Sequence, residues 1–345
     1  MQTPAAILIE QNKPLEFAEV SLPPLSYGQV LVDVQVSRIC GSQIGEIDGV
    51  KGPDRWLPHL LGHEGFGSVL EVGPEVKTVK PGDSVVLHWR PGSGIEAQCP
   101  QYGWEGKVIN AGKVTTFNRY AVISENRLTA VPKEVDPEVG ALLADTLTTG
   151  FGIISNDAKL KIGESVVLWG CGGIGSGVIL GARLAGAYPV IAIDLYEHKL
   201  EKAKALGATH TFLGNDPELE EKIRALVGGD GADVAIDGTG IPSVIEQAYE
   251  LTHAKGRCVL FGVMPHEKKV CLHTLPLHFG KILTGSEGGS SQPDKDIPRI
   301  LRMLEAGCFD PTGLVSHRIP LEETNDAIAK MRSGEVMHAM IHFKD

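Results

Sequence analysis

The sequence lacks four features, and each absence narrows the class of protein. Its six cysteines are scattered with no Cys-x-x-Cys pair, so neither a zinc ribbon nor a disulfide framework is indicated. It has no basic run, and 32 Lys and Arg against 43 Asp and Glu give a net charge of −11, which disfavours a nucleic-acid surface. No window approaches the ~20 apolar residues of a membrane span, and no signal-peptide pattern opens the chain. We therefore expect a cytoplasmic protein that binds neither nucleic acid nor a membrane.

The pattern of the chain changes near residue 150. Up to about residue 135, apolar and polar residues alternate between Gly-Pro and Pro-Gly-Asp turns, as in QVLVDVQVSRIC at 29–40, which is typical of an antiparallel barrel-like domain. Beyond 150, apolar strands such as VVLW at 166–169 alternate with helical segments, which indicates a parallel sheet covered on both faces. A chain of 36.9 kDa is long enough for two such domains. The fold class expected is α/β.

A glycine-rich turn joins the strand at 166–169 to the helix that follows. Gly170, Gly172 and Gly175 match G-x-G-x-x-G, whose glycines allow a tight turn, close approach of a pyrophosphate and close packing of the helix. The next strand ends in Asp194, about 20 residues beyond the last glycine, as NAD-binding folds require. Its carboxylate can accept hydrogen bonds from the ribose hydroxyls of NAD and would repel the 2′-phosphate of NADP. Lys199 can reach the same ribose, or it is simply an exposed helix residue.

Several blocks of sequence carry a resemblance to a known family. They are CGS at 40–42, GHEGFGSVLEVG at 62–73, VKPGDSVV at 79–86, ALLADTLTTGFGII at 141–154, GCGGIG at 170–175 and DGTG at 237–240. In order and spacing the chain resembles the zinc-dependent medium-chain dehydrogenase/reductase superfamily, which includes alcohol, threonine and polyol dehydrogenases. The resemblance implies a GroES-like catalytic domain formed by residues 1–149 and 287–345, a Rossmann NAD-binding domain at 150–286, and an active site in the cleft between them.

The resemblance also assigns roles to individual residues. Cys40, His63 and Asp145 match the ligands of the family's catalytic zinc, and thiolate, imidazole and carboxylate all suit that metal. For Asp145 the alternative is a helix or turn cap. Glu64 matches an alternating ligand or a neighbour of the metal, and Ser42 a hydroxyl that passes the alcohol proton outward. One catalytic zinc is expected, and no structural zinc, because Cys99 stands alone where many relatives carry four cysteines.

The remaining expectations concern the cofactor and the substrate. Further cofactor contacts implied by the resemblance are Gly173, Ile174, Thr239, Phe261, Val263 and His338, the last standing where relatives often have an arginine. Trp89 matches a pocket residue beside the zinc, flanked by His88 and Arg90, and Arg55 and Trp56 lie on a loop before the GHE block. Gln43 replaces an aspartate that braces the zinc-bound histidine in the family, so weaker zinc binding is expected.

We therefore expect an oxidoreductase that uses zinc to transfer a hydride between NAD(H) and an alcohol or carbonyl substrate, a polyol or sugar derivative. A homodimer or homotetramer is expected through residues 269–286. Two alternatives stay open: a zinc-free NADPH quinone or enone reductase of the same superfamily, and a nucleotide-binding relative without activity.

The cofactor preference can be tested at Asp194. Placing a phosphate dianion against this carboxylate costs enough for at least about a tenfold preference for NAD(H) over NADP(H) in kcat/KM. Replacing it, in Asp194→Ser, should narrow the difference because the repulsion is removed. Comparable kcat/KM values for both cofactors in the unmodified protein would contradict the assignment.

Overall fold

The structure, a computed structural model, describes residues 1–343, so the last two residues of the predicted catalytic domain lie outside the described residues. The chain divides into two compact units. Unit 1 contains Met1–Asp145 together with the chain from Gln292 onward, and unit 2 is Thr146–Ser291. These limits lie a few residues from the division expected at 149/150 and 286/287. The α/β class is confirmed, with a β-rich unit and a parallel-sheet unit.

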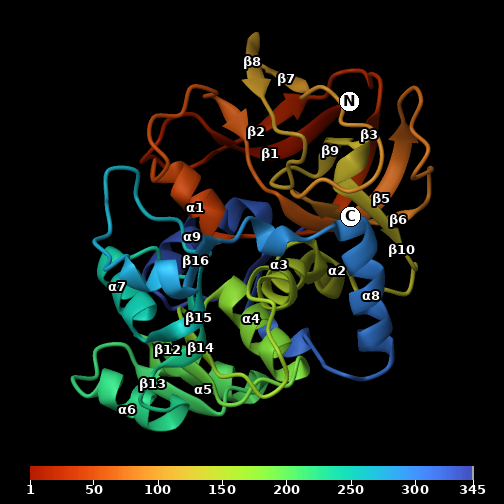
Figure 1. Ribbon diagram of the computed structural model, residues 1–345. Coiled ribbons are helices and arrows are strands. Elements are labelled where there is room, and N and C mark those ends of the chain that lie inside the picture. Colours follow the sequence, from red (N-terminus) through yellow and green to blue (C-terminus); the bar gives the residue numbers. More distant parts are fainter. Residues whose placement is uncertain (344–345) are drawn as a thin grey trace. The chain divides into compact units, whose positions relative to one another are not determined.

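Unit 1 is built mainly from antiparallel strands (Figure 1). One set closes into a barrel in the order β1 (Gln2–Leu8), β2 (Glu16–Ser21), β7 (Gln101–Trp104), β8 (Lys107–Asn110) and β4 (His59–Leu60). The other is a sheet ordered β10 (Leu128–Val131), β6 (Ser84–His88), β5 (Glu64–Val72), β3 (Gln29–Arg38), β18 (Ala339–His342) and β17 (His317–Ile319), with β9 (Tyr120–Ser124) also pairing with β3. Alternate residues of β3 (Val30, Val32 and Val34) pack with Val69 of β5 and with Val85 and Leu87 of β6 in one core cluster.

The C-terminal strand completes the sheet that the N-terminal part of the chain begins. Strand β18 pairs antiparallel with β3, and Met340 lies opposite Arg38. Ala339, Met340 and Ile341 are fully buried in this pairing. Unit 1 therefore includes the chain from Gln292 onward, because β18 pairs with a strand of its N-terminal part.

Four α-helices of the described part of unit 1 flank these strands, and α2 matters most for the site. The others are α1 (Gly41–Ile47), α8 (Pro293–Glu305) and α9 (Thr324–Arg332). Helix α2 (Pro137–Ala144) begins at Asp136, whose carboxylate accepts hydrogen bonds from the Glu138 and Val139 amides, with Pro137 in the first turn. A Cβ on Gly140 would lie 2.2 Å from the Phe66 ring, so only glycine lets α2 approach β5 this closely. That approach brings the C-terminal end of α2 to the start of β5.

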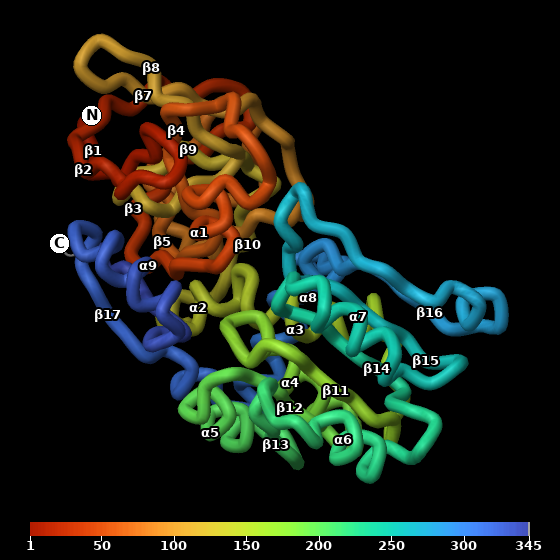
Figure 2. Tube along the Cα trace, turned by 90° about the vertical axis from the view of Figure 1, so that its left-hand side faces the viewer, coloured from red at the N-terminus to blue at the C-terminus, as the bar shows by residue number. Residues whose placement is uncertain are grey.

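Unit 2 is a six-stranded parallel sheet with helices along it. The strand order is β13 (His210–Leu213), β12 (Val190–Asp194), β11 (Val166–Trp169), β14 (Ala232–Asp237), β15 (Thr252–Leu260) and β16 (Ile282–Gly285), and the outermost strands lie at opposite ends of the row in Figure 2. Its helices are α3 (Thr146–Gly152), α4 (Gly173–Leu184), α5 (Glu197–Leu206), α6 (Leu219–Val227) and α7 (Pro242–Glu250). In chain order the strands run 3-2-1-4-5-6, the arrangement of the dinucleotide-binding Rossmann fold.

The glycine turn between β11 and α4 has the geometry that its sequence predicts. Gly170 has φ of 95°, a conformation that favours glycine. A Cβ on Gly175 would lie 2.1 Å from the Gly170 carbonyl oxygen, whereas a Cβ on Gly172 would meet nothing within 4 Å. The backbone of the turn is therefore packed against itself at Gly175. At Gly172 no atom lies close by, so a ligand can approach the backbone there.

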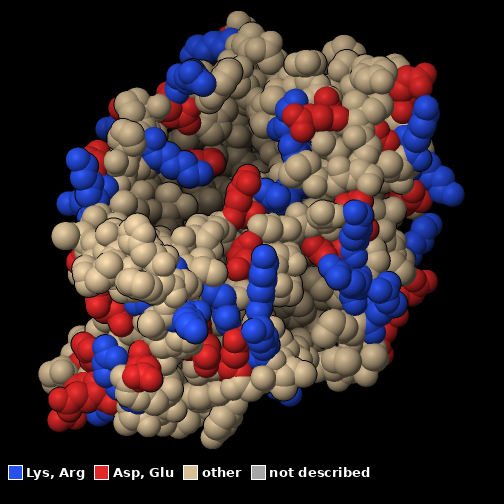
Figure 3. Space-filling view, in the orientation of Figure 1, with Lys and Arg blue, Asp and Glu red and all other residues tan. Residues whose placement is uncertain are grey.

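The surface agrees with the charge balance of the sequence. On the face shown in Figure 3, Lys and Arg side chains are interspersed with Asp and Glu and form no continuous basic stripe.

Among the described helices, none has the length and apolar character needed to cross a membrane.

Candidate metal centre

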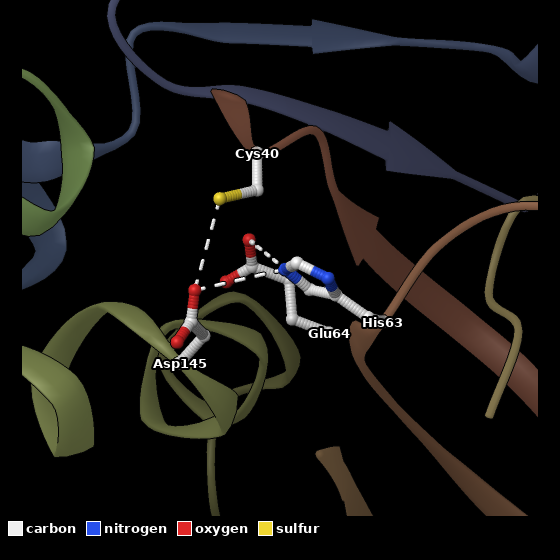
Figure 4. A group of neighbouring side chains, drawn as sticks. All are labelled: Cys40, His63, Glu64 and Asp145. Carbon is white, nitrogen blue, oxygen red and sulfur yellow. Dashed lines mark hydrogen bonds and ion pairs between the residues drawn. The ribbon is translucent and has the colours of Figure 1, made fainter. Parts of the chain in front are cut away.

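Four potential metal ligands of unit 1 converge on one point (Figure 4). Cys40 follows strand β3 and caps α1, and His63 and Glu64 stand where β5 begins. Asp145 is the C-cap of α2, a position that the close contact of Gly140 with β5 brings within reach. The structure thus brings together residues that lie up to about a hundred positions apart in the chain.

The distances within this group fit a tetrahedral metal ion. Asp145 Oδ2 lies 3.7 Å from Cys40 Sγ and 3.6 Å from His63 Nε2, and His63 Nε2 lies 3.9 Å from Glu64 Oε1. One ligand atom from each of the four residues lies within 4.8 Å of all the others. Zinc bonds of ~2.0–2.3 Å at tetrahedral angles require ligand atoms roughly 3.3–3.8 Å apart. The donor set suits zinc, and the two distances from Asp145 Oδ2 fall in this range.

The cluster concentrates negative charge in a buried place. Glu64 is fully buried, and Cys40 and Asp145 are nearly so. Burial raises the pKa of Glu64 to about 7, against the opposing effect of Arg38. Burial also lowers the pKa of His63, but the Asp145 carboxylate and the Cys40 thiol beside the ring outweigh it, so this pKa lies well above its ordinary value. These groups together stabilise a positive charge among them, which is what a metal-binding site must do.

One oxygen of Glu64 is left for such a cation. Its Oε1 accepts a 2.6 Å hydrogen bond from Arg38 Nη1, whereas Oε2 is buried with no hydrogen-bond partner. A buried carboxylate oxygen without a partner is costly. A metal ion among the four ligands would remove that cost.

Arg38 is the buried cation of the site. It is 1 % exposed, it pairs with Glu64, and its Nε donates to His338 Nδ1 at 2.9 Å. His338 is itself fully buried and lies next to β18. The predicted contact of His338 with a cofactor phosphate is therefore corrected: the ring is inside unit 1, bound to Arg38, and not on a surface that a phosphate can reach.

Gln43 and Ser42 lie on the other side of the His63 ring. Gln43 is 1 % exposed, its Oε1 accepts from the Cys40 amide at 3.0 Å, and its Nε2 lies 2.8 Å from His63 Nδ1. Ser42 Oγ lies 3.3 Å from both ring nitrogens. The histidine is thus held by α1, the same short helix that Cys40 caps.

Trp89 is the predicted pocket residue that the structure brings to the cluster. Its Nε1 donates to Asp145 Oδ1 at 3.0 Å, and its ring centroid lies 6.3 Å from that of His63. The Arg90 guanidinium lies 5.6 Å from the centroid of the Trp89 ring. With Oδ1 held by Trp89, the other Asp145 oxygen faces Cys40 and His63.

Two neighbours of these pocket residues lie elsewhere than expected. His88 is fully buried, where its Nδ1–H donates to the Arg90 carbonyl at 2.8 Å and Nε2 lies 2.9 Å from Thr129 Oγ1. Burial lowers its pKa to about 4, so it is a neutral core residue and not a donor beside the pocket. Trp56 is 61 % exposed, with Arg55 5.3 Å from its ring centroid, and lies on the surface of unit 1.

The predicted cofactor residues, except His338, gather in unit 2. Asp194 ends β12 beside the glycine turn, and its Oδ2 accepts a 2.9 Å hydrogen bond from the Cys171 amide. Helix α4 begins at Gly173, so Ile174 and the neighbouring amides form its first turn. This turn, open at Gly172 and flanked by an acidic strand end, fits the pyrophosphate and ribose of a dinucleotide.

The other cofactor candidates surround a second turn, after β14. Thr239 Oγ1 donates to Asp237 Oδ1 at 2.6 Å, and the Gly240 amide donates to the other oxygen of the same carboxylate. A Cβ on Gly238 would lie 2.2 Å from the Phe261 ring, and Val263 is 55 % exposed. Lys199 lies apart from this turn, on α5 after β12, where its Nζ is 4.7 Å from the centroid of the Tyr196 ring.

Sequence reasoning missed two residues that organise these sites. Arg38 is a charged residue at the end of the apolar strand β3, two positions before Cys40, and that position is the signal that could have revealed it. Asp237, which ends β14 and is fully buried, holds the turn of Thr239 and Gly240 through three hydrogen bonds from those two residues.

Comparison with known proteins agrees with this geometry. Residues 26–133 match the alcohol dehydrogenase GroES-like domain, and residues 173–306 match the zinc-binding dehydrogenase domain. The chain is 30% identical to the alcohol dehydrogenase class-3 of Cereibacter sphaeroides over 99% of its own length and all of the relative, and 31% identical to an NDMA-dependent alcohol dehydrogenase of Amycolatopsis methanolica over 99% of each. The benzyl alcohol dehydrogenase structure from Acinetobacter calcoaceticus superposes with a TM-score of 0.89 at 26% identity, covering all of both chains.

A β-rich unit with a closed barrel and a seven-stranded sheet, a Rossmann unit and a Cys-His-Glu-Asp cluster define a zinc-type oxidoreductase. The chain belongs to the zinc-dependent medium-chain dehydrogenase superfamily.

The buried pair of Arg38 and Glu64 predicts a strong effect on stability. In Arg38→Met, the Glu64 carboxylate loses its buried partner, and the free energy of unfolding of unit 1 should fall by about 3–5 kcal/mol. The double variant Arg38→Met/Glu64→Gln should lose less than the single variant, because no uncompensated charge remains. Denaturant unfolding of the metal-free variants measures both effects. Equal losses in the single and double variants would show that the pair is not coupled.

Proposed function

We propose that this protein is an NAD(H)-dependent zinc alcohol dehydrogenase whose substrate is a polar alcohol, such as a polyol or a sugar derivative. The observation that carries the proposal is the convergence of Cys40, His63, Glu64 and Asp145 at spacings suited to zinc. Zinc binding is common to the family, whereas the dinucleotide and the substrate class are read from this chain's own residues.

The protein groups around the proposed metal have distinct tasks. Cys40, His63 and Asp145 would hold zinc, with Glu64 beside them, and bound zinc polarises an alcohol oxygen and lowers its pKa. Trp89 orients Asp145 through its indole N–H, and so keeps one carboxylate oxygen directed at the other ligands. Ser42, whose hydroxyl touches the His63 ring, is the group we propose to accept the proton of the bound alcohol and pass it outward. The hydride chemistry itself belongs to the cofactor.

The preference for NAD(H) is supported by unit 2. Asp194 accepts hydrogen bonds from the Cys171 and Tyr196 amides, and a carboxylate oxygen retains lone pairs for a ribose hydroxyl after one such bond. The residue that follows is Leu195, which offers a phosphate no positive charge. Both features favour a ribose with a free 2′-hydroxyl.

Removal of one ligand tests the metal assignment. Cys40→Ala should lose both the zinc and the turnover, because His63, Asp145 and a Glu64 carboxylate already paired with Arg38 do not hold the ion tightly. The matched control is Cys99→Ala, which removes an exposed cysteine outside the cluster and should retain one zinc per chain. Metal content by mass spectrometry and NADH absorbance measure the two effects. Full activity of a metal-free preparation, especially with NADPH and a quinone, would favour the zinc-free reductase instead.

The polar substrate is supported by Trp89 and Arg90. An aromatic face beside the cluster, with a guanidinium stacked on it, suits a hydroxyl-rich or charged substrate better than an alkyl chain. The names of the relatives span S-(hydroxymethyl)glutathione and benzyl alcohol, so the family resemblance by itself does not choose between these classes.

The substrate class can be tested at Arg90. Arg90→Ala should raise KM for polyols and sugar derivatives by about tenfold, the value of one charged hydrogen bond, with a smaller change for simple alcohols. The matched control is Arg55→Ala, which removes a guanidinium stacked on the exposed Trp56. Higher kcat/KM for butanol than for every polyol or sugar would contradict the substrate class, and unchanged kinetics in Arg90→Ala would contradict the role of the residue.

We also propose that the protein is a homodimer or homotetramer. Strand β16 is an edge of the unit 2 sheet, and an edge strand presents unpaired backbone groups. Next to it, Leu275, Phe279 and Ile282 are 54 %, 69 % and 48 % exposed, which is unusual for side chains so apolar. A second copy of the chain that adds its own edge strand here would cover both.

Assembly can be tested with a charge on the edge strand. Ile282→Lys should shift the protein toward monomers in sedimentation at micromolar concentration, because a buried lysine without a partner is unfavourable at an interface. Ile162→Lys changes an isoleucine that is 89 % exposed outside this edge and should leave the assembly unchanged. A monomeric unmodified protein at micromolar concentration would refute the proposal.

A further inference from the structure

A single buried carboxylate holds the loop that follows strand β6. This loop, residues 89–100, connects β6 to β7 and includes Trp89 and Arg90, the two side chains that the proposed function assigns to the substrate, and we call it the pocket loop. Glu125, in the short 3₁₀ helix after β9, is 1 % exposed. Its Oε2 accepts the Ile95 N–H, from the middle of the pocket loop, at 2.8 Å. The position of the loop therefore depends on a side chain from a distant part of the sequence.

The other oxygen of Glu125 is bound by a second loop. Its Oε1 accepts from the Lys77 N–H at 2.6 Å, from the Thr78 N–H at 2.7 Å and from the Thr78 hydroxyl at 3.0 Å. Burial raises the pKa of Glu125, but the hydrogen bonds from Lys77, Ile95 and Thr78 outweigh it, so this pKa lies below its ordinary value. The side chain is therefore a carboxylate at neutral pH, and it joins two loops through four donors.

The backbone next to Glu125 also pairs with the pocket loop. The Gly92 N–H donates to the Asn126 carbonyl at 2.8 Å, and the Asn126 N–H donates to the Ile95 carbonyl at 3.1 Å. Gly92 lies two residues after Arg90. These bonds and the carboxylate together fix the course of the chain that carries the Arg90 guanidinium.

The contact with Glu125 is close at the middle of the pocket loop and independent of its far end. Gly94 has φ of 104°, a conformation that favours glycine, and a Cβ there would lie 2.8 Å from Glu125 Cγ. Beyond it the loop has its own anchor, because the Ala97 N–H donates to Ser124 Oγ at 2.8 Å. Loss of the bond to Glu125 should therefore release the middle of the loop and leave its far end in place.

A carboxylate satisfies all four donors, whereas the amide of equal size does not. Each carboxylate oxygen can accept more than one hydrogen bond, and neither carries a hydrogen. In a glutamine one oxygen is replaced by an NH₂ group, which would face either the Ile95 N–H or the donors of Lys77 and Thr78. A buried donor without an acceptor is costly. The Ile95 side, which has one bond against three, is the side we expect to open.

We propose that Glu125 is a positioning residue for substrate binding: by holding the pocket loop it keeps the Arg90 guanidinium over the Trp89 ring, 5.6 Å from the ring centroid, without touching the substrate itself. The inference rests on the proposed function and adds to it the group that holds one of its specificity residues in place. Trp89 has its own anchor, because its indole N–H donates to Asp145 Oδ1. The effect of Glu125 should therefore fall on Arg90 and on KM, and spare the proposed zinc ligands.

Glu125→Gln tests this role with a side chain of equal size. It should raise KM for polyols and sugar derivatives by about three- to tenfold, up to the loss expected when Arg90 itself is removed, with kcat changed by less than about twofold and the zinc content unchanged. In an Arg90→Ala background the same substitution should raise KM no further, because the residue through which it acts is absent. The matched control is Glu96→Gln, which removes a carboxylate of the same loop whose side chain is 54 % exposed, and which should leave KM unchanged.

Amide hydrogen exchange measures the pocket loop without reference to activity. Exchange in the peptide that covers residues 91–97 should be faster in Glu125→Gln than in the unmodified protein or in Glu96→Gln, because the Ile95 N–H loses its acceptor. If Glu125→Gln does not fold, Gly94→Ala replaces it. The added Cβ would press on the same side chain, and the same rise in KM is expected.

A rise in KM that disappears in the Arg90→Ala background, together with faster exchange of the loop, supports the inference. It is overturned by unchanged exchange, by unchanged KM, by an effect on KM that multiplies with that of Arg90→Ala, or by loss of kcat and zinc in step with stability. Failure of the unmodified protein to oxidise any polar alcohol with NAD, while the exchange of the loop still responds to Glu125→Gln, would instead reject the proposed function and with it the role in substrate binding.

Discussion

The accumulation of negative charge in the core of unit 1 is the constraint on which the site depends. Cys40, Glu64 and Asp145 place a thiol and two carboxyl groups within a few ångströms of one another, nearly out of contact with water. Buried negative charges are tolerated only when positive charges lie beside them. Arg38 supplies one positive charge from within the fold, and a divalent ion would balance the remainder: two carboxylates and a thiolate against one guanidinium and two metal charges sum to zero.

The architecture of unit 1 delivers these charges from three separate elements. The end of β3 provides Arg38 and, beyond it, Cys40; the start of β5 provides His63 and Glu64; and the end of α2 provides Asp145. Close packing at Gly140 sets the distance between α2 and β5. The pairing of β18 with β3 buries His338 against Arg38, so the C-terminal strand also supports the cation that balances Glu64. A local change in any of these elements would therefore move the proposed ligand atoms relative to one another.

The hydrogen bonds around His63 connect one of the proposed zinc ligands to side chains of α1. Gln43 lies buried between the Cys40 amide, which donates to its Oε1 at 3.0 Å, and His63 Nδ1, which lies 2.8 Å from its Nε2. In a buried polar network of this kind, no water is present to form a hydrogen bond with a group that loses its partner.

The local patterns of the sequence determined which residues are candidates for binding the dinucleotide and which kinds of unit the chain forms. The change from alternating strands to strand–helix repeats indicated the two kinds of unit, and the glycine turn with Asp194 indicated the dinucleotide site, since these depend on neighbours in the chain. The resemblance then placed Cys40, His63 and Asp145 in one site. Only the tertiary structure decided how the site is balanced: that Arg38 is buried on Glu64, that His338 and His88 are core residues, and that Gln43 lies against His63. These depend on which atoms of distant segments meet and in which orientation, and a pattern of residue types along the chain does not contain that information.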